Sequence, residues 1–202
     1  MSDTLIIGLT GNIGTGKTTV LNMLAARGAR IIDADEVAHQ VTAPGGNAFA
    51  SIIALFGQAI LDPNGAIDRS RLGQIVFGNP DKLAQLEKIV HPAVYEAVNA
   101  EVERATEAVV VIEAIKLLEA GMAASLCDQV WVITSPVEQQ VERLMNDRGM
   151  SRAAARARMA TQSPQAFKVS QANVVLDNSS TLADLERQVE AAWQRLGLPA
   201  PA

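Results

Sequence analysis

Residues Gly11–Thr18, near the start of the chain, are the group best suited to chemistry. Their sequence, GNIGTGKT, fits the pattern G-x-x-x-x-G-K-[ST]. Glycines in this pattern let the backbone wrap around a phosphate with its N–H groups pointing inward. The ammonium of Lys17 would reach the β- and γ-phosphates, and the hydroxyl of Thr18 would complete a Mg²⁺ shell. The segment therefore predicts a P-loop that binds a nucleoside triphosphate with Mg²⁺.

The residues on both sides of this segment predict the elements that a phosphate site needs. The apolar run Leu5–Thr10 precedes it and predicts a strand, and Val20–Ala26 follows at helical spacing. A helix starting near Lys17 adds the positive end of its dipole. A purely structural glycine turn is the alternative, but it leaves Lys17 unexplained. The residues expected to contact the nucleotide here are Asn12, Ile13, Gly14, Thr15, Gly16, Lys17, Thr18 and Thr19.

Two acidic residues stand at the end of the second predicted strand, Arg30–Asp33. Ligands of open α/β sheets bind beyond the carboxyl ends of the strands, so we expect Asp33 to face the same crevice as the P-loop. We interpret Asp33 as the base that accepts a proton from an attacking hydroxyl. Asp35 is interpreted as the N-cap of the following helix or as a residue that supports Asp33.

A basic stretch at residues 143–168 contrasts with the formal net charge of −5 of the whole chain. For any single arginine in it, a solvated helix face is the alternative. As a group, these side chains favour a mobile lid that screens the charge of a transferring phosphoryl group. This interpretation predicts that Arg143→Ala lowers turnover far more than stability. The basic residues are Arg143, Arg148, Arg152, Arg156, Arg158 and Lys168.

Composition narrows the class of protein. The chain has 202 residues, 49% of them hydrophobic, which suits one sizeable globular core. No run approaches the ~18 apolar residues of a membrane helix, and the N-terminal residues lack the features of a secretory signal, so we expect a cytoplasmic protein. The negative net charge disfavours a general nucleic-acid binder. Cys127 is the only cysteine, which excludes an internal disulfide and favours a buried small residue.

Strand-like runs alternate with helical patterns, and most are nearly continuous in Val and Ile. This is typical of a parallel sheet that is buried on both faces. Helix ends are also marked: Ser135–Glu138 reads as a capping box with proline at the first helical position, and Gly149 as the stop of that helix. Ser151 and Thr181–Asp184 read as caps of two later helices. The expected strands are Leu5–Thr10, Arg30–Asp33, Ala108–Glu113, Gln129–Thr134 and Asn173–Leu176.

A long insert, from Thr42 to about Thr106, interrupts this alternation between the second and third strands. Connections of this length are candidate substrate subdomains. His91 precedes Pro92, which predicts a helix start there, and its place in the insert makes it a candidate for substrate binding. His39 is expected to be an ordinary surface or core histidine.

The motifs, and their order along the chain, resemble those of the dephospho-CoA kinase family. The asparagine at position 12, where the family usually has glycine, and Asn173, where it often has aspartate, are departures. So is the segment Glu113–Glu119, which places Lys116 where an apolar residue is common. The matching residues are Gly8–Thr18, Ile32–Asp35, Pro44-Gly45, Phe56-Gly57, Gly65–Arg69, Leu72, Val76-Phe77, Leu86-Glu87, His91-Pro92, Gln140, Arg143, Arg148, Gln162, Lys168 and Asn178.

The resemblance implies transfer of a phosphoryl group from ATP to the 3′-hydroxyl of dephospho-CoA, and the P-loop predicts Mg²⁺ as the cofactor. From the net charge and the lack of a long apolar run, we expect no nucleic-acid or membrane partner. It implies a single domain over residues 1–202 with a three-layer α/β/α P-loop NTPase fold and a five-stranded parallel sheet. The core is expected at about 1–41, 107–142 and 169–202, a helical CoA-binding insert at about 42–106, and the lid at about 143–168.

The resemblance also implies roles for individual residues. Arg143 and Arg148 correspond to the lid arginines, Arg71 and His91 to residues on the acceptor side, and Asn178 to the loop that approaches the adenine. Asp33 corresponds to the base, with Asp35 beside it. The alternatives are another small-molecule P-loop kinase, such as a nucleoside monophosphate kinase, or a non-kinase ATPase switch. The sequence leaves the oligomeric state open.

Overall fold

The computed structural model describes residues 4–119, 121 and 126–198. The chain forms two compact units. The first consists of Met1–Ile32 and Ala105–Ala202, and the second of Asp33–Arg104. The second unit begins nine residues before the expected insert, so it also includes the helix that follows the second strand.

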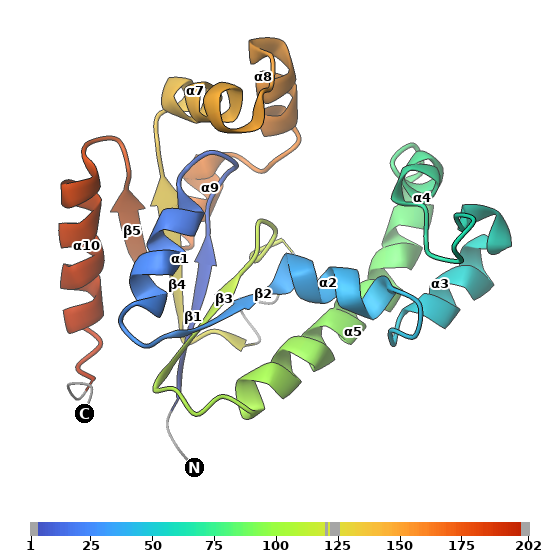
Figure 1. The fold of residues 1–202 in the computed structure, drawn as a ribbon, viewed down its shortest axis with the longest axis horizontal. Helices are drawn as coiled ribbons and strands as arrows, with labels where there is room; N and C mark the ends of the chain where they lie inside the picture. The colour runs from blue at the N-terminus through green and yellow to red at the C-terminus, as the bar shows by residue number, and fades with distance from the viewer. Residues whose placement is uncertain (1–3, 120, 122–125, 199–202) are drawn as a thin grey trace. The chain divides into compact units, whose positions relative to one another are not determined.

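The first unit is built on a five-stranded sheet with the strand order β2-β3-β1-β4-β5 (Figure 1). The pairs β1–β3, β1–β4 and β4–β5 are parallel. The predicted parallel sheet is therefore confirmed, and the predicted strand bounds differ from the observed ones by one residue at most. The strands are β1 (Leu5–Thr10), β2 (Arg30–Asp33), β3 (Val109–Glu113), β4 (Gln129–Thr134) and β5 (Val174–Asp177).

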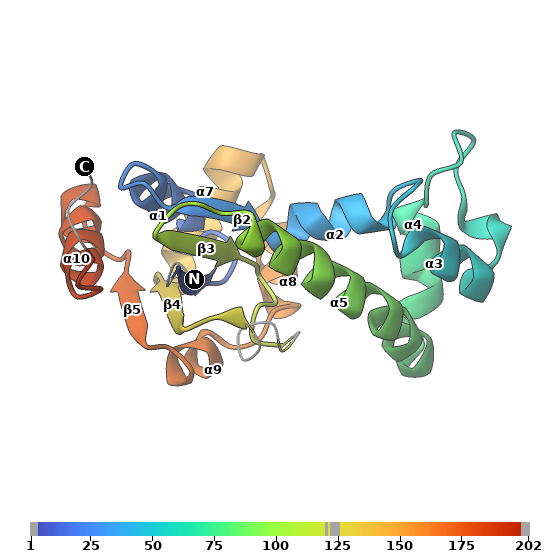
Figure 2. The same cartoon turned by 90° about the horizontal axis from the view of Figure 1, so that it is seen from below.

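Helices cover both faces of this sheet, which gives the expected three-layer α/β/α architecture. On one face, α1 (Lys17–Ala25) and α10 (Leu182–Gln194) pack their buried side chains against alternate residues of the strands. On the other face, α9 (Gln165–Ser170) packs against β4 (Figure 2). Alternate positions of each strand point to opposite faces. The residues buried between the sheet and the first two helices include Ile7, Leu9, Val20, Leu24, Val111, Trp131, Ile133, Leu185 and Val189.

Two predicted helix caps after β4 are confirmed. The hydroxyl of Ser151 accepts a hydrogen bond from Ala154 N at 3.2 Å at the start of α8 (Arg152–Ala160). Thr181 and Asp184 form a reciprocal capping box at the start of α10. The helix α7 (Val137–Arg148) ends as predicted at Gly149, which has a left-handed φ of 63°.

The predicted capping box at Ser135 is wrong. The N-cap of α7 is Pro136, and no side chain caps this helix. Ser135 Oγ lies instead 3.1 Å from Gln139 Oε1 and 3.2 Å from the carbonyl oxygen of Asn178. The carboxylate of Glu138 is paired with Arg152 and Arg156, so it does not reach back to the helix start.

The second unit is helical. Its longest helix, α5, packs closely against α2, and α3 and α4 also contact α5. No helix of the described residues has both the length and the apolarity that crossing a membrane requires. The helices are α2 (Ala34–Thr42), α3 (Phe49–Phe56), the 3₁₀ helix η1 (Gln58–Ile60), α4 (Arg69–Val76) and α5 (Pro80–Glu103).

The predicted helix start at His91-Pro92 is also wrong, because α5 continues through both residues. The helix begins instead at Pro80, where the side chain of Asn79 accepts a hydrogen bond from Lys82 N at 3.1 Å. A proline inside a helix loses one backbone hydrogen bond and costs about 3 kcal/mol. Ala93, Val94 and Val98, which follow the proline, are buried. Their packing offsets this cost and keeps the helix continuous.

Candidate active site

The loop between β1 and α1 has the backbone of a preformed anion site. Gly14 and Gly16 have φ values of 79° and 99°, which side-chain-bearing residues rarely adopt. A Cβ atom on Gly16 would also lie 2.3 Å from Asn178 Nδ2. Gly16 is the N-cap of α1, and no side chain caps this helix. The N-terminal end of α1 is therefore left for an anion, which its N–H groups and dipole favour.

Lys17 is the first residue of α1, and its side chain folds back to the start of the loop. Its Nζ donates a hydrogen bond to Gly11 O at 3.0 Å and lies 3.7 Å from Glu113 Oε1, at the end of β3. Both side chains are nearly buried, 12% and 10% exposed. The cation is thus held against the P-loop from one side by backbone and from the other by a carboxylate.

The threonines of the loop have different surroundings. Thr15 is buried, and its Oγ1 donates to Asn12 O at 2.8 Å, so this side chain shapes the loop itself. Thr18 is exposed and Thr19 is half-buried at the start of α1. The hydroxyl of Thr18 makes no hydrogen bond to any described residue.

Arg143, on α7, binds carbonyl oxygens of the P-loop backbone. Its Nη1 donates to Gly14 O at 3.0 Å, Thr15 O at 3.2 Å and Ser135 Oγ at 3.2 Å, and its Nη2 donates to Asn178 O at 3.1 Å. Asn178 Nδ2 donates to the same Thr15 carbonyl at 2.8 Å. Arg143, predicted as a catalytic lid arginine, and Asn178, predicted to bind ATP, thus meet at the carbonyl oxygen of Thr15.

The helices of the predicted lid pack on the tip of the P-loop. Ile13 is buried in one apolar cluster with Val141, Leu144 and Ala155 of α7 and α8. The basic residues of the predicted lid divide into three groups. Arg143 and Lys168 are bonded within the fold, Arg152 and Arg156 pair with Glu138, and Arg148 and Arg158 are exposed without an ion pair to any described residue.

Asp33 ends β2 and is itself the N-cap of α2. Its Oδ1 accepts hydrogen bonds from Asp35 N at 2.9 Å and Glu36 N at 3.0 Å. The prediction that Asp35 caps this helix is therefore wrong, because the backbone is still extended at Asp33 and turns helical at Ala34. Asp35 lies in the first turn, where the helix dipole favours a carboxylate. Both aspartates are exposed.

The two other residues predicted for the acceptor lie on different helices. Arg71, on α4, donates from Nη1 to Leu61 O at 2.7 Å, and its Nε lies 3.1 Å from Asp68 Oδ2. This arginine therefore braces the loop before its own helix. His91 is exposed in the middle of α5, and its side chain forms no hydrogen bond with any described residue.

The second unit contains a small, mainly apolar pocket of about 170 Å³. Arg69 contributes its only charged side chain, and its Nη2 donates to Thr42 Oγ1 at 3.3 Å. Neither Arg71 nor His91 lines it. The pair Asp68-Arg69 was among the motifs of the family resemblance, but no role was predicted for Arg69. The pocket is lined by Ala38, Thr42, Ile52, Ile67, Arg69, Leu72, Leu86 and Val90.

Comparisons with known proteins agree with this arrangement. The family model described as Dephospho-CoA kinase matches residues 5–184. A dephospho-CoA kinase of Thermobifida fusca is 42% identical over 192 residues, covering 95% of this chain and 96% of the relative. A crystal structure from Thermus thermophilus has a TM-score of 0.83 and 34% identity, covering 95% and 97% of the two chains. A dephospho-CoA kinase structure from Campylobacter jejuni has a TM-score of 0.68 and 26% identity, covering 95% and 96%.

Proposed function

The chain belongs to the dephospho-CoA kinase family, and we propose a role for each part of its site in that reaction. The protein transfers a phosphoryl group from ATP to the 3′-hydroxyl of dephospho-CoA, which yields coenzyme A and ADP. The observation that carries this conclusion is the match of the family model to residues 5–184, which includes the P-loop and Arg143.

The donor side would bind ATP through the backbone N–H groups at the start of α1 and through Lys17. The lack of a side-chain cap on α1 supports this role. The exposed hydroxyl of Thr18 fits the oxygen ligands that Mg²⁺ prefers, together with phosphate oxygens. When bound there, Mg²⁺ supplies neutralisation of charge on the β- and γ-phosphates.

Asp33 would orient the acceptor hydroxyl and accept its proton as the hydroxyl oxygen attacks the γ-phosphorus in line. Its N-cap bonds support this role, because they fix the direction of the carboxylate through Oδ1. No described residue donates a hydrogen bond to Oδ2. We assign to Asp35 a supporting charge in the same first turn.

Arg143 would hold the P-loop carbonyls and, with Arg148, stabilise the charge of the transferring phosphoryl group. The hydrogen bonds of Arg143 to Gly14 and Thr15 support the first role, and the free exposure of Arg148 supports the second. We assign to Asn178 a place beside the adenine. Its hydrogen bond to Thr15 O ties the loop after β5 to the P-loop.

The acceptor would extend along α2. Thr42 lies nine residues after Asp33, which is about 14 Å along a helix. A substrate with its hydroxyl at Asp33 therefore reaches the pocket at Thr42 and Arg69 with its extended arm. The apolar lining suits the pantetheine arm of dephospho-CoA, and Arg69 suits an anionic group. Arg71 and His91 remain proposed acceptor contacts outside this pocket.

The test is ADP release with ATP and Mg²⁺ in the presence of dephospho-CoA, AMP, CMP, shikimate or no acceptor. Mass spectrometry should show one added phosphate on dephospho-CoA alone. Turnover with another acceptor only, or equal hydrolysis without an acceptor, would contradict the proposal. A cytoplasmic location and the absence of nucleic-acid and membrane partners belong to the same proposal, and fractionation of cells tests them.

A further inference from the structure

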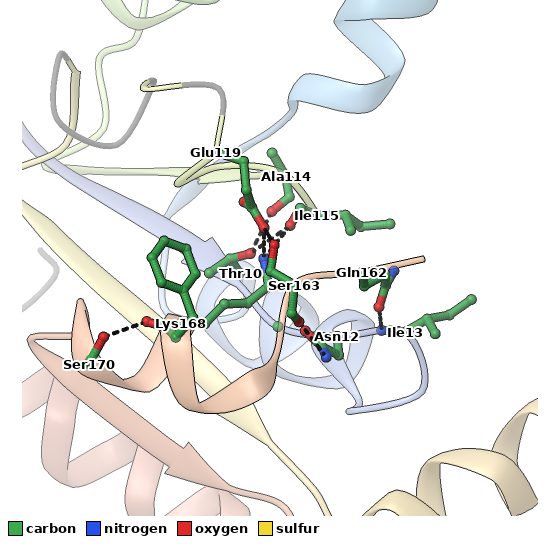
Figure 3. A network of polar contacts seen from close by, with 12 residues as sticks. Thr10, Asn12, Ile13, Ala114, Ile115, Glu119, Gln162, Ser163, Lys168 and Ser170 are labelled. Carbon is green, nitrogen blue, oxygen red and sulfur yellow. Dashed lines mark hydrogen bonds and ion pairs between the residues drawn. The ribbon is translucent and has the colours of Figure 1, made fainter. Parts of the chain in front are cut away.

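Lys168, on α9, carries a fully buried ammonium group. Its Nζ donates to Ile115 O at 2.7 Å and to Glu119 Oε1 at 3.0 Å (Figure 3). A buried charge is costly unless it is paired and hydrogen-bonded. The basic-lid hypothesis counted this lysine among cations that face a phosphate. The structure instead uses it to join α9 to the segment that follows β3.

Glu119 is the meeting point of that segment with the end of the lid. Its carboxylate accepts hydrogen bonds from Lys168 Nζ and from Ser163 Oγ. Burial alone would raise the pKa of Glu119, but the hydrogen bonds from Ser163 and Lys168 outweigh this effect and hold its pKa below the usual value. The carboxylate is therefore ionised at neutral pH and binds both donors as an anion.

The residues that Glu119 holds are bonded in turn to the P-loop. Asn12 Nδ2 donates to Ser163 O at 3.2 Å, and Ile13 N donates to Gln162 Oε1 at 2.8 Å. Two consecutive residues after α8 thus fix two consecutive residues of the P-loop (Figure 3). One bond starts from the side chain of Asn12 and the other from the backbone of Ile13. Together they fix both the position and the orientation of the loop relative to the segment after α8.

A second hydrogen bond joins the start of the P-loop to the segment after β3. Thr10, the last residue of β1, donates from Oγ1 to Ala114 O at 2.8 Å. The next carbonyl, Ile115 O, is the one that Lys168 binds. The first half of the P-loop is therefore held at both of its ends by segments that meet at the Glu119–Lys168 pair.

We propose that Glu119 and Lys168 are positioning residues for ATP, which act by fixing Gln162-Ser163 against Asn12-Ile13. Neither side chain touches the phosphate-binding residues Gly14–Thr18. The ion pair keeps the segment after α8 in place, and that segment holds the start of the loop in the conformation that receives the phosphates. This inference rests on the proposed nucleotide site and extends it to residues outside the P-loop.

The alternative is that the network only stabilises the fold. The two cases differ in which measured quantity changes. A positioning role raises the KM and Kd for ATP and leaves the KM for dephospho-CoA unchanged. A purely structural role lowers the unfolding midpoint and leaves both KM values of the folded fraction unchanged.

The experiment compares Lys168→Met and Glu119→Gln with the control Glu190→Gln. Glu190 forms a more exposed ion pair of similar length with Arg27, with an Nη2–Oε2 distance of 2.8 Å, between α10 and the second residue after the end of α1. Loss of a hydrogen bond to a charged group predicts a rise of about tenfold in the KM for ATP. The KM for dephospho-CoA should stay within about twofold of wild type, and the control should keep both constants. An unchanged KM for ATP in folded variants would overturn the proposal.

A second measurement tests the path itself. Ser163→Ala removes the hydroxyl that binds Glu119 and keeps the carbonyl that binds Asn12. Because the two side chains act on one path, its effect and that of Lys168→Met should be less than multiplicative when combined. Fully multiplicative effects would contradict the claim that Lys168 and Ser163 both act on the P-loop through Glu119. If Lys168→Met does not fold, Ser163→Ala and Asn12→Ala still decide, because an unchanged ATP constant in both rejects the inference.

A binding assay with a fluorescent ATP analogue separates this inference from the proposed reaction. It reports nucleotide affinity without any acceptor. Unchanged affinity in the variants would reject the positioning role even if dephospho-CoA is phosphorylated. Failure of wild type to phosphorylate dephospho-CoA would reject the reaction while leaving the binding result intact.

Discussion

The donor-side and acceptor-side residues are held in place by different kinds of contact. On the donor side, the P-loop is bonded to distant segments through Arg143, Asn178 and Gln162, and its threonine at position 15 is fully buried. On the acceptor side, Asp33 and Arg71 are exposed, and their side chains bond only to residues close in the sequence. The P-loop is thus fixed by tertiary contacts, whereas the side chains of Asp33 and Arg71 are fixed by local caps and turns.

This difference predicts how the two sides respond to substitution. Changes on the donor side should lower stability and nucleotide affinity together, because the same hydrogen bonds serve both. Changes on the acceptor side should alter turnover with little change in stability.

The largest effect is expected for Lys17→Met. The change removes the cation from the phosphate site but keeps a side chain of similar length next to Gly11 and Glu113. Loss of one preorganised electrostatic contact to the transition state lowers turnover by about 1,000-fold. ADP release at saturating ATP measures it. A loss of less than about tenfold would remove Lys17 from the electrostatic role.

Asp33→Asn is the corresponding test on the acceptor side. Asparagine is as good an N-cap as aspartate, so the unfolding midpoint should stay unchanged. Loss of the proton acceptor should lower turnover by about 100-fold or more, with ATP affinity unaffected.

Asp62→Asn provides the matched control for this substitution. The Oδ1 atom of Asp62 also accepts two backbone hydrogen bonds, from Asn64 N at 2.8 Å and Ala66 N at 3.0 Å. The Asp62→Asn variant should keep wild-type turnover. Equal loss in both variants would show that the effect comes from the local bonds and not from a base at Asp33.

The two arginines of α7 test the contrast within one helix. Arg143→Ala removes the hydrogen bonds of this arginine to the carbonyl oxygens of Gly14, Thr15 and Asn178 and should lower the free energy of unfolding by about 2 kcal/mol. Thr15 O keeps its bond from Asn178 Nδ2, and Asn178 O keeps its bond from Ser135 Oγ, so the main loss is at Gly14 O. The KM for ATP should rise with it. Arg148 is exposed, so Arg148→Ala should leave the unfolding midpoint unchanged. Denaturant titrations of both variants measure this difference. Equal midpoints would contradict the claim that the hydrogen bonds of Arg143 to the P-loop stabilise the fold.

That prediction revises what the sequence alone indicates for Arg143. The basic stretch predicts an effect on turnover far larger than the effect on stability, since the bonds of this arginine to P-loop carbonyls are not visible in the sequence. The strands were predictable because each is a nearly continuous apolar run, and the P-loop because its glycines and Lys17 have fixed spacing.

The features that sequence reasoning missed depend on contacts between distant residues. The helix α5 passes through Pro92 because Ala93 and Val94 are buried by other helices, which a local rule cannot include. Ser135 binds near Asn178 instead of capping α7 because β4 and β5 are neighbours in the sheet. Lys168 looked like a lid cation because its partner, Glu119, is far away in the sequence.

The smallest expected effect concerns the acid stability of the donor side. Hydrogen bonds from Ser163 and Lys168 lower the pKa of Glu119 from its usual 4.5, against the opposing effect of burial. A carboxyl whose pKa is lower in the folded state stabilises the fold fully above its unfolded pKa. That contribution is lost as the pH falls through the folded pKa. The free energy difference between wild type and Glu119→Gln should therefore be largest near pH 7 and shrink below about pH 4.5.

Denaturant titrations between pH 3.5 and 7 would measure this difference (about 1 kcal/mol or less for a partly exposed pair). Repeating them at high salt separates a held pair from a surface pair, since buried charges are screened much less than exposed ones. A difference that is independent of pH would show that Glu119 stabilises through packing alone. A difference that disappears with salt would place the pair among the exposed, locally held contacts that characterise the acceptor side.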